Sequence, residues 1–83
     1  MINVKDAAKK AIDYFNDLYK EQAYESIALE ELELSSTKDR WIITIGYNKP
    51  GFSWVMAGSM RKYKIFEIDT ESGNVISMKM RIV

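Results

Sequence analysis

Apolar and polar residues repeat with a helical period over the first quarter of the chain. At 100° per residue the apolar side chains fall on one side of a helix, and the charged and amide side chains fall on the other. Asn3 can cap this helix, and Asp6 favours its positive end. The apolar set is Val4, Ala7, Ala8, Ala11, Ile12, Phe15, Leu18 and Tyr19. The pattern predicts an amphipathic helix whose alanines approach a sheet closely, with Ile12, Phe15 and Leu18 as the bulk.

A different period begins at residue 27, where apolar and acidic residues alternate up to residue 34. The alternation slips by one residue, because the apolar positions are odd before Glu30–Glu31 and even after it. A slip of one residue within a strand indicates a β-bulge, since it would otherwise move the apolar side chains to the opposite face. We therefore predict a strand from about Ala28 to Ser35 with an irregularity near Glu30–Glu31.

Three further strands are predicted. A polar turn at residues 35–40 leads into an alternating run, Trp41–Asn48, which favours a hairpin. The last part of the chain has the pattern of a second hairpin, with strands Tyr63–Asp69 and Val75–Val83. In the turn between them, Asp69 can bond the backbone two residues on, and Gly73 tolerates a positive φ.

The sequence thus predicts an α+β fold in one domain, residues 1–83, with one N-terminal helix packed on a four-stranded antiparallel meander sheet. The sheet side of the core is expected to hold Leu32, Leu34, Trp41, Ile43, Ile45, Phe66, Ile68, Ile76, Met78 and Met80. The opposite, mostly polar face is expected to hold Glu31, Glu33, Ile42, Thr44, Tyr63, Ile65, Glu67, Ser77, Lys79 and Arg81.

The amino-acid composition narrows the range of possible functions. The 83 residues include twelve basic and twelve acidic residues, so we expect no nucleic-acid partner, which needs a concentrated basic face. Cysteine and histidine are both absent, which removes thiolate metal sites and the commonest general base. We expect no cofactor, no membrane association and a cytoplasmic protein as written, or an extracytoplasmic one if the chain is excised from a longer precursor.

Three groups of charged residues suggest chemistry, and each has a plainer interpretation. Glu31 and Glu33 share a strand face and could form a carboxylate pair, but a solvated face explains them better. The turn residues Asp69, Glu71 and Asn74 offer oxygen ligands without the spacing of a calcium loop. A basic stripe could bind single strands beside aromatic side chains, although nearby glutamates would cancel much of its field. Its members are Lys38, Arg40, Arg61, Lys62, Lys64, Lys79 and Arg81.

The connection 48–61 contains the sharpest functional candidates. We predict that Phe52, Trp54, Val55 and Met56 anchor a partner, with Trp41 and Tyr63 as neighbours. Aromatic and methionine side chains are enriched where proteins meet partners. The same segment could instead close one end of the core, or bury against a second copy in a homodimer.

Several segments carry a family resemblance: A-A-K-K-A-I, L-E-E-L-E-L, W-I-I-T-I, Y-K-I-F-E-I-D and D-T-E-S-G-N-V. Together they resemble the PepSY-type domain, which has an alanine-rich first helix, an acidic and hydrophobic strand and a closing V-D-x-x-T-G-x-V hairpin. Ser72 stands where that hairpin usually has threonine. The resemblance implies a cystatin-like helix on an antiparallel sheet, and a role in binding, inhibiting or regulating proteases.

The residues and the resemblance together predict a non-enzymatic protein-binding module that docks a partner, or itself, through the apolar loop, a sheet edge or the outer sheet face. Two alternatives stay open: a small-ligand-binding domain with a cavity between helix and sheet, or a homodimeric structural protein. A hydrolase would have to use a carboxylate as its base.

Overall fold

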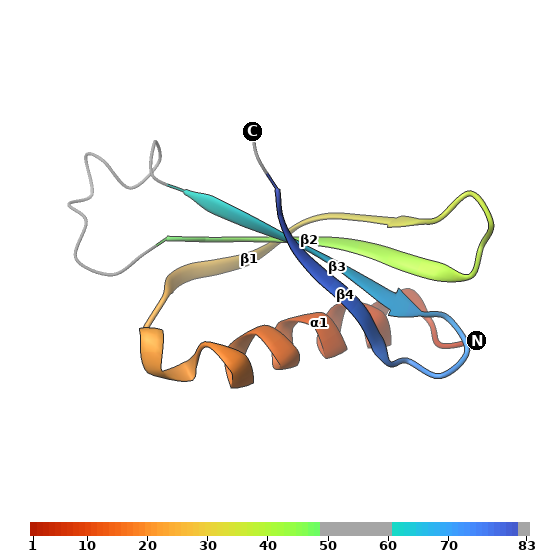
Figure 1. Cartoon of the computed structure of the whole chain (residues 1–83), viewed down its shortest axis with the longest axis horizontal. Coiled ribbons are helices and arrows are strands. Elements are labelled where there is room, and N and C mark those ends of the chain that lie inside the picture. Colours follow the sequence, from red (N-terminus) through yellow and green to blue (C-terminus); the bar gives the residue numbers. More distant parts are fainter. Residues whose placement is uncertain (49–60, 82–83) are drawn as a thin grey trace.

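The computed structural model describes residues 1–48 and 61–81. One helix lies against a single antiparallel sheet whose strands follow one another in chain order, β1-β2-β3-β4 (Figure 1). The elements are α1 (Val4–Leu18), a short 3-10 turn (Lys20–Gln22), β1 (Glu25–Leu34), β2 (Arg40–Asn48), β3 (Lys62–Asp69) and β4 (Val75–Arg81). The predicted fold class, a helix on a four-stranded meander, is confirmed.

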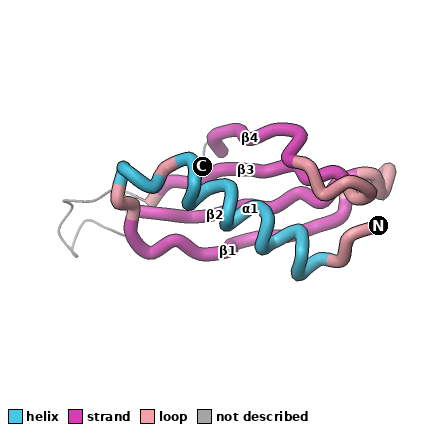
Figure 2. The backbone as a smooth tube through the Cα atoms, turned by 90° about the horizontal axis from the view of Figure 1, so that it is seen from below, coloured by secondary structure: helices cyan, strands magenta, loops and turns pink. Residues whose placement is uncertain are grey.

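Helix α1 begins and ends as local chemistry dictates. The Asn3 side chain accepts a hydrogen bond from the Asp6 backbone N–H at 2.8 Å, which satisfies one of the free donors of the first turn. Beyond Leu18 the chain turns away through Ala23, whose φ is 52°. The helix crosses the strands obliquely (Figure 2), and at its last turn Tyr19 packs against the core. Leu18 is exposed, so its predicted place in the core was wrong.

The core lies under the middle of the helix. Ala7, Ala11 and Phe15 are fully buried against inward-facing side chains of β2 and β3. The two small alanines bring the helix close to the sheet, and Phe15 fills the space that remains. The buried sheet residues are Ile43, Ile45, Tyr47, Phe66 and Ile68. Tyr19, Tyr24 and Tyr47 extend the core past the helix end as an aromatic cluster around Phe15.

Strand β1 contains the predicted bulge. Leu29 pairs with Ile45 and Glu31 pairs with Thr44, so Glu30 is an extra residue without a partner on β2. The extra residue restores the alternation, so Leu29 and Leu32 both lie in rows with helix-facing residues of β2. A second register shift lies nearer the start of β1, where Ser26 has a φ of 52°.

The turn between β3 and β4 also forms as predicted. The Asp69 carboxylate accepts hydrogen bonds from the backbone N–H groups of Glu71 at 2.8 Å and Ser72 at 3.0 Å. Gly73 takes the positive φ, 76°, and its missing side chain leaves room for Lys10 to pass over it. The tight turn sets where β4 begins.

A single helix does not cover all four strands. A helix with its side chains is about 10–12 Å wide, whereas the outermost of four strands lie about 14 Å apart. Ile76 is therefore 46% exposed and Met80 is 57% exposed, although both were predicted on the core side. Leu32 at the opposite edge is also exposed. We call the face against α1 the helix side and the opposite face the outer face.

Candidate functional site

The outer face is the part of the sheet that no described element covers (Figure 1). The strand register sets its side chains in three rows that cross all four strands. The first row is Glu33, Ile42, Glu67 and Ser77, the second is Glu31, Thr44, Ile65 and Lys79, and the third is Ala28, Gly46, Tyr63 and Arg81. These rows contain every residue that the sequence assigned to this face.

An ion pair between the two edge strands shows that this face is concave. The guanidinium of Arg81 on β4 pairs with the carboxylate of Glu31 on β1, across the two central strands. Three strand spacings amount to about 14 Å in a flat sheet, so the edges have to lean toward each other for the side chains to meet. The groove beneath has a volume of about 400 Å³. Its lining is Glu31, Leu32, Glu33, Ile42, Thr44, Ile65 and Arg81.

The floor of the groove is largely apolar. Thr44 is only 4% exposed although it lies on the face opposite the helix. Ile42 and Ile65 beside it are half-buried. An outer face that only met water would ordinarily be polar along its length, so two isoleucines on this one provide an apolar surface for a bound group.

A second ion pair lies on the outer face at the bulge. The Arg61 guanidinium holds the Glu30 carboxylate, with 2.6 Å between Nη2 and Oε1, and also donates to the Asn48 amide oxygen at 3.3 Å. This pair lies over Gly46, where a Cβ would stand 2.7 Å from the Glu30 oxygen. Gly46 therefore leaves the space that lets Glu30 and Arg61 meet above the sheet.

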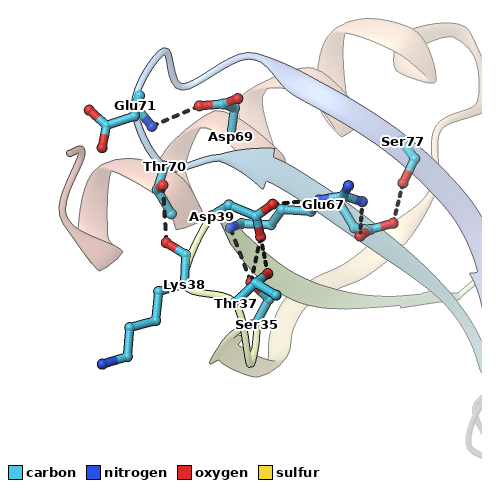
Figure 3. A network of polar contacts seen from close by, with 10 residues as sticks. Ser35, Thr37, Lys38, Asp39, Glu67, Asp69, Thr70, Glu71 and Ser77 are labelled. Atoms are coloured by element: carbon cyan, nitrogen blue, oxygen red, sulfur yellow. Dashed lines mark hydrogen bonds and ion pairs between the residues drawn. The ribbon is translucent and has the colours of Figure 1, made fainter.

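A hydrogen-bonded carboxylate lies in the first row (Figure 3). Ser77 Oγ donates to one oxygen of Glu67 at 2.7 Å, and Arg40 Nη1 donates to the other at 3.0 Å. The Ser77 hydrogen bond, followed by the Arg40 interaction, holds the pKa of Glu67 below its usual 4.5. Glu67 is therefore ionised at neutral pH and acts as a fixed negative charge, which makes it a poor general base.

The structure separates the two described candidates that were predicted as partner contacts. Tyr63 lies on the outer face, between Gly46 and Arg81 in the third row. Trp41 lies on the helix side, where it packs against the core and its indole Nε1 donates to the Ile2 carbonyl at 3.2 Å. The other four predicted contacts, Phe52, Trp54, Val55 and Met56, lie outside the described residues.

The other sites suggested by the sequence are the Asp69 turn, the Glu31 and Glu33 pair and a cavity between helix and sheet. Asp69 uses its carboxylate on the turn backbone, and within residues 1–48 and 61–81 no group of three or more acidic side chains is placed to hold a metal ion. Glu31, half of the predicted carboxylate pair, is bound to Arg81. The middle of the contact between helix and sheet is filled by fully buried side chains. A cavity of about 220 Å³ lies at the helix end, around Phe15, Tyr19 and Tyr24. A wider, open hollow of about 780 Å³ lies between α1 and the start of β4, lined by Lys10, Asp13, Tyr14, Asp17, Gly73, Asn74 and Val75.

Sequence reasoning placed the right residues on the outer face but missed the groove. The bulge at Glu30 was its one local signal, because a bulge bends and twists the strand that carries it. The contact between Glu31 and Arg81 joins residues fifty positions apart, so no local pattern in the sequence indicates it.

Comparisons with protein-family models, with curated proteins and with solved structures gave no match. Among the described helices, none has both the length and the apolar character needed to cross a membrane. Because no related protein indicates a function, the groove is interpreted from the side chains that line it.

Proposed function

We propose that the protein is a non-enzymatic binding module that docks an extended segment of a partner protein in the groove of the outer face. The observation that carries the proposal is the groove itself, about 400 Å³, with Ile42 and Ile65 on its floor and opposite charges at its two rims. Glu31 stands at the β1 rim, and Arg81 stands at the β4 rim. Both signs of charge with an apolar floor suit a polypeptide better than a uniformly apolar or uniformly charged ligand.

The bridge over the groove can open at low free-energy cost. The side chains of Arg81 and Glu31 are 37% and 59% exposed, and such pairs contribute at most about 1 kcal/mol. A partner segment can replace the bridge by offering a basic residue to Glu31 and an acidic residue to Arg81. An apolar residue between those two would then lie over Ile42 and Ile65. The proposed motif is a basic, an apolar and an acidic residue that follow the direction from β1 to β4.

Enzymatic roles have less support. The sequence contains no histidine, Glu67 is held ionised by its hydrogen bonds, and the Glu31 carboxylate is bound by arginine. A small ligand would find no space under the middle of the helix, where Phe15 and the two alanines are fully buried. The hollow between α1 and the start of β4 is wide and open, so it would enclose a small ligand poorly. The PepSY resemblance supplies a narrower proposal, that the partner is a protease. Contact by Phe52, Trp54, Val55 and Met56 also stays a prediction.

Photo-crosslinking in the cells that make the protein tests the docking site. A photoreactive phenylalanine analogue replaces Ile65 on the groove floor, and the matched control carries it at Lys9 on the exposed side of α1. We expect a discrete protein adduct from position 65 and none of the same mass from position 9. Identical adducts from both positions, or none from position 65, would contradict docking in the groove.

A charge swap tests the recognition itself. The double variant Glu31→Arg with Arg81→Glu keeps an ion pair across the groove, so the fold is expected to hold, but it reverses the charges of the two rims. We expect the crosslinking yield at position 65 to fall by about tenfold or more, because each partner charge would then face a like charge. An undiminished yield with an unchanged thermal transition would show that the rims take no part in recognition.

A further inference from the structure

Strand β4 forms an open edge of the sheet. From Ser77 to Arg81 it pairs residue by residue with β3, and its one register shift leaves Ile76 without a partner on β3. Within residues 1–48 and 61–81, no strand pairs with the other side of β4, so its outward backbone N–H and C=O groups are open to a further strand. Such a regular edge is a template for strand addition.

The exposed apolar side chains of β4 flank this edge on the helix side. Strand alternation places Ile76, Met78 and Met80 on one face, and Tyr19 fixes that face as the helix side because its hydroxyl contacts the Met78 sulfur at 3.9 Å. Ile76 and Met80 are the two that remain largely exposed. They lie two residues to either side of Met78, so the apolar pattern is symmetric about that residue.

This symmetry identifies the occupant. We propose that β4 pairs antiparallel with β4 of a second copy, about a twofold axis that passes through Met78. In that register Ile76 of each copy faces Met80 of the other, and the two Met78 side chains face each other. Four exposed apolar side chains then cover one another, and the two sheets join into one with eight strands.

The polar side chains on the outer face of β4 are also complementary in this register. On the outer face, Lys79 of each copy lies directly opposite Ser77 of the other. The Glu67 carboxylate, which accepts a hydrogen bond from Ser77 at 2.7 Å, stands one strand further in. The lysine ammonium of one copy therefore approaches a fixed negative charge of the other, so the charges are complementary about the axis.

The neighbouring registers fit less well. Residues opposite each other must lie on the same face, so the axis passes through a residue position, and the two nearest alternatives are Ser77 and Lys79. With the axis at Lys79, the two Lys79 side chains face each other as like charges. With the axis at Ser77, Lys79 on the outer face would have to pair with Val75, which the register shift places on the helix side, and Met80 stays exposed. Only the axis at Met78 covers both exposed residues, Ile76 and Met80, and also separates the lysines.

Sedimentation velocity of the purified protein tests the pairing. One strand pair buries less area than a stable interface of about 1,200 Å² or more, so we expect a dissociation constant of about 10–100 µM. Met80→Lys should weaken the dimer at least tenfold, because it places a charge opposite Ile76. The control Leu18→Lys changes an exposed apolar residue at the helix end and should leave the association unchanged.

Cysteine substitution tests the register, and the natural chain contributes no thiol to the reaction. Met78→Cys should form a disulfide-linked dimer under mild oxidation, because directly opposed residues have Cα atoms about 4.5–5.5 Å apart. Ser77→Cys or Lys79→Cys alone should not, because each would lie about 8 Å from its own copy. The double variant Ser77→Cys with Lys79→Cys should link again, and it leaves the contact between Tyr19 and Met78 intact.

The two assays distinguish this inference from the proposed function. A protein that stays monomeric at about 500 µM, with no linkage in any cysteine variant, overturns self-pairing and leaves docking in the groove untouched. Linkage by the single variants at position 77 or 79, without linkage at position 78, overturns the register. Dimerisation with linkage through position 78 supports the inference even if no partner occupies the groove.

Discussion

The two edge strands of the sheet are built in opposite ways. Strand β1 contains two register shifts, one of which lies where Ser26 takes a left-handed conformation. It also carries glutamates at four of its ten positions. Strand β4 has one shift, at its start, and then runs regularly to Arg81. Bulges and charge are the usual means of protecting an edge, so β1, with two shifts and four glutamates, is better protected against strand addition than β4, with one shift and two cations.

The difference in construction gives the two edge strands different roles. The β1 bulge places Glu30 as the extra residue, and long-range ion pairs to Arg61 and Arg81 bring the acidic strand over the outer face. Strand β4 is positioned instead by the tight turn at Asp69 and Gly73. One edge shapes the groove, and the other stays regular enough to pair. The predictions below measure how far each edge depends on its own construction.

The largest difference in stability is expected between a substitution in the centre of the core and one at the β4 edge. Phe15→Ala should lower the free energy of unfolding by about 3–5 kcal/mol, because it leaves a cavity where a large, fully buried side chain lay beneath the helix. Met80→Ala at the β4 edge should lower it by less than about 1 kcal/mol, since the side chain is mostly exposed. Urea unfolding at a concentration where the protein is monomeric checks both values. Equal losses would mean that the edges belong to the core.

A smaller loss of stability is expected when alanine replaces the glycine near each edge, Gly73 in the turn before β4 and Gly46 beneath the β1 bulge. Gly73→Ala should cost about 1–2 kcal/mol, because alanine is strained at a φ of 76° and Lys10 must move as well. Gly46→Ala also crowds its neighbours, but those are the flexible ends of Glu30 and Arg61. Its cost should stay below about 1 kcal/mol.

Thermal unfolding of the two glycine variants provides the measurement, and hydrogen exchange locates the effect. Faster exchange in β4 is expected for the Gly73 variant, whereas the Gly46 variant should change exchange only along β1 and the adjoining part of β2. A larger loss from the Gly46 variant would show that β1 depends on its ion pairs more than β4 depends on its turn.

The sequence predicted the elements because their signals are local. The helical period, the Asn3 cap, the slip at Glu30 and the turn at Asp69 and Gly73 each involve residues close together in the chain. All four signals are confirmed in the structure. The faces of the strands followed from alternation alone, which is why the outer-face residues were assigned correctly.

Burial at the edges could not be predicted from the same signals. Ile76, Met80 and Leu18 have the right period to be core residues, but whether a side chain is covered depends on how wide the helix is and how it crosses the sheet. The groove could not be predicted either, because the curvature of the sheet is evident from a long-range contact, between Glu31 and Arg81. Periodicity gives the face of a residue, and only the assembled fold gives its exposure.

The smallest expected effect is the dependence of stability on acid pH, and it should fall on the β4 side. Backbone N–H groups of Ser72 and Glu71 lower the pKa of Asp69 from its usual 3.8, and Ser77 followed by Arg40 lowers that of Glu67 from 4.5. Because both values are lower in the folded chain, these carboxylates stabilise the fold fully above about pH 5. Their contribution is lost as the pH falls below 4 through the folded values.

Asp69→Asn keeps a side-chain oxygen that can accept the turn N–H groups but removes the titration. It should therefore flatten the fall of the unfolding temperature between about pH 5 and pH 2. Glu67→Gln should flatten it independently, because the two carboxylates have different hydrogen-bond partners. Hydrogen exchange at low pH should show the hairpin of β3 and β4 opening before β1 separates from β2. Parallel pH profiles for wild type and both variants, or earlier exchange in β1, would assign the acid-sensitive part of the fold to the other edge.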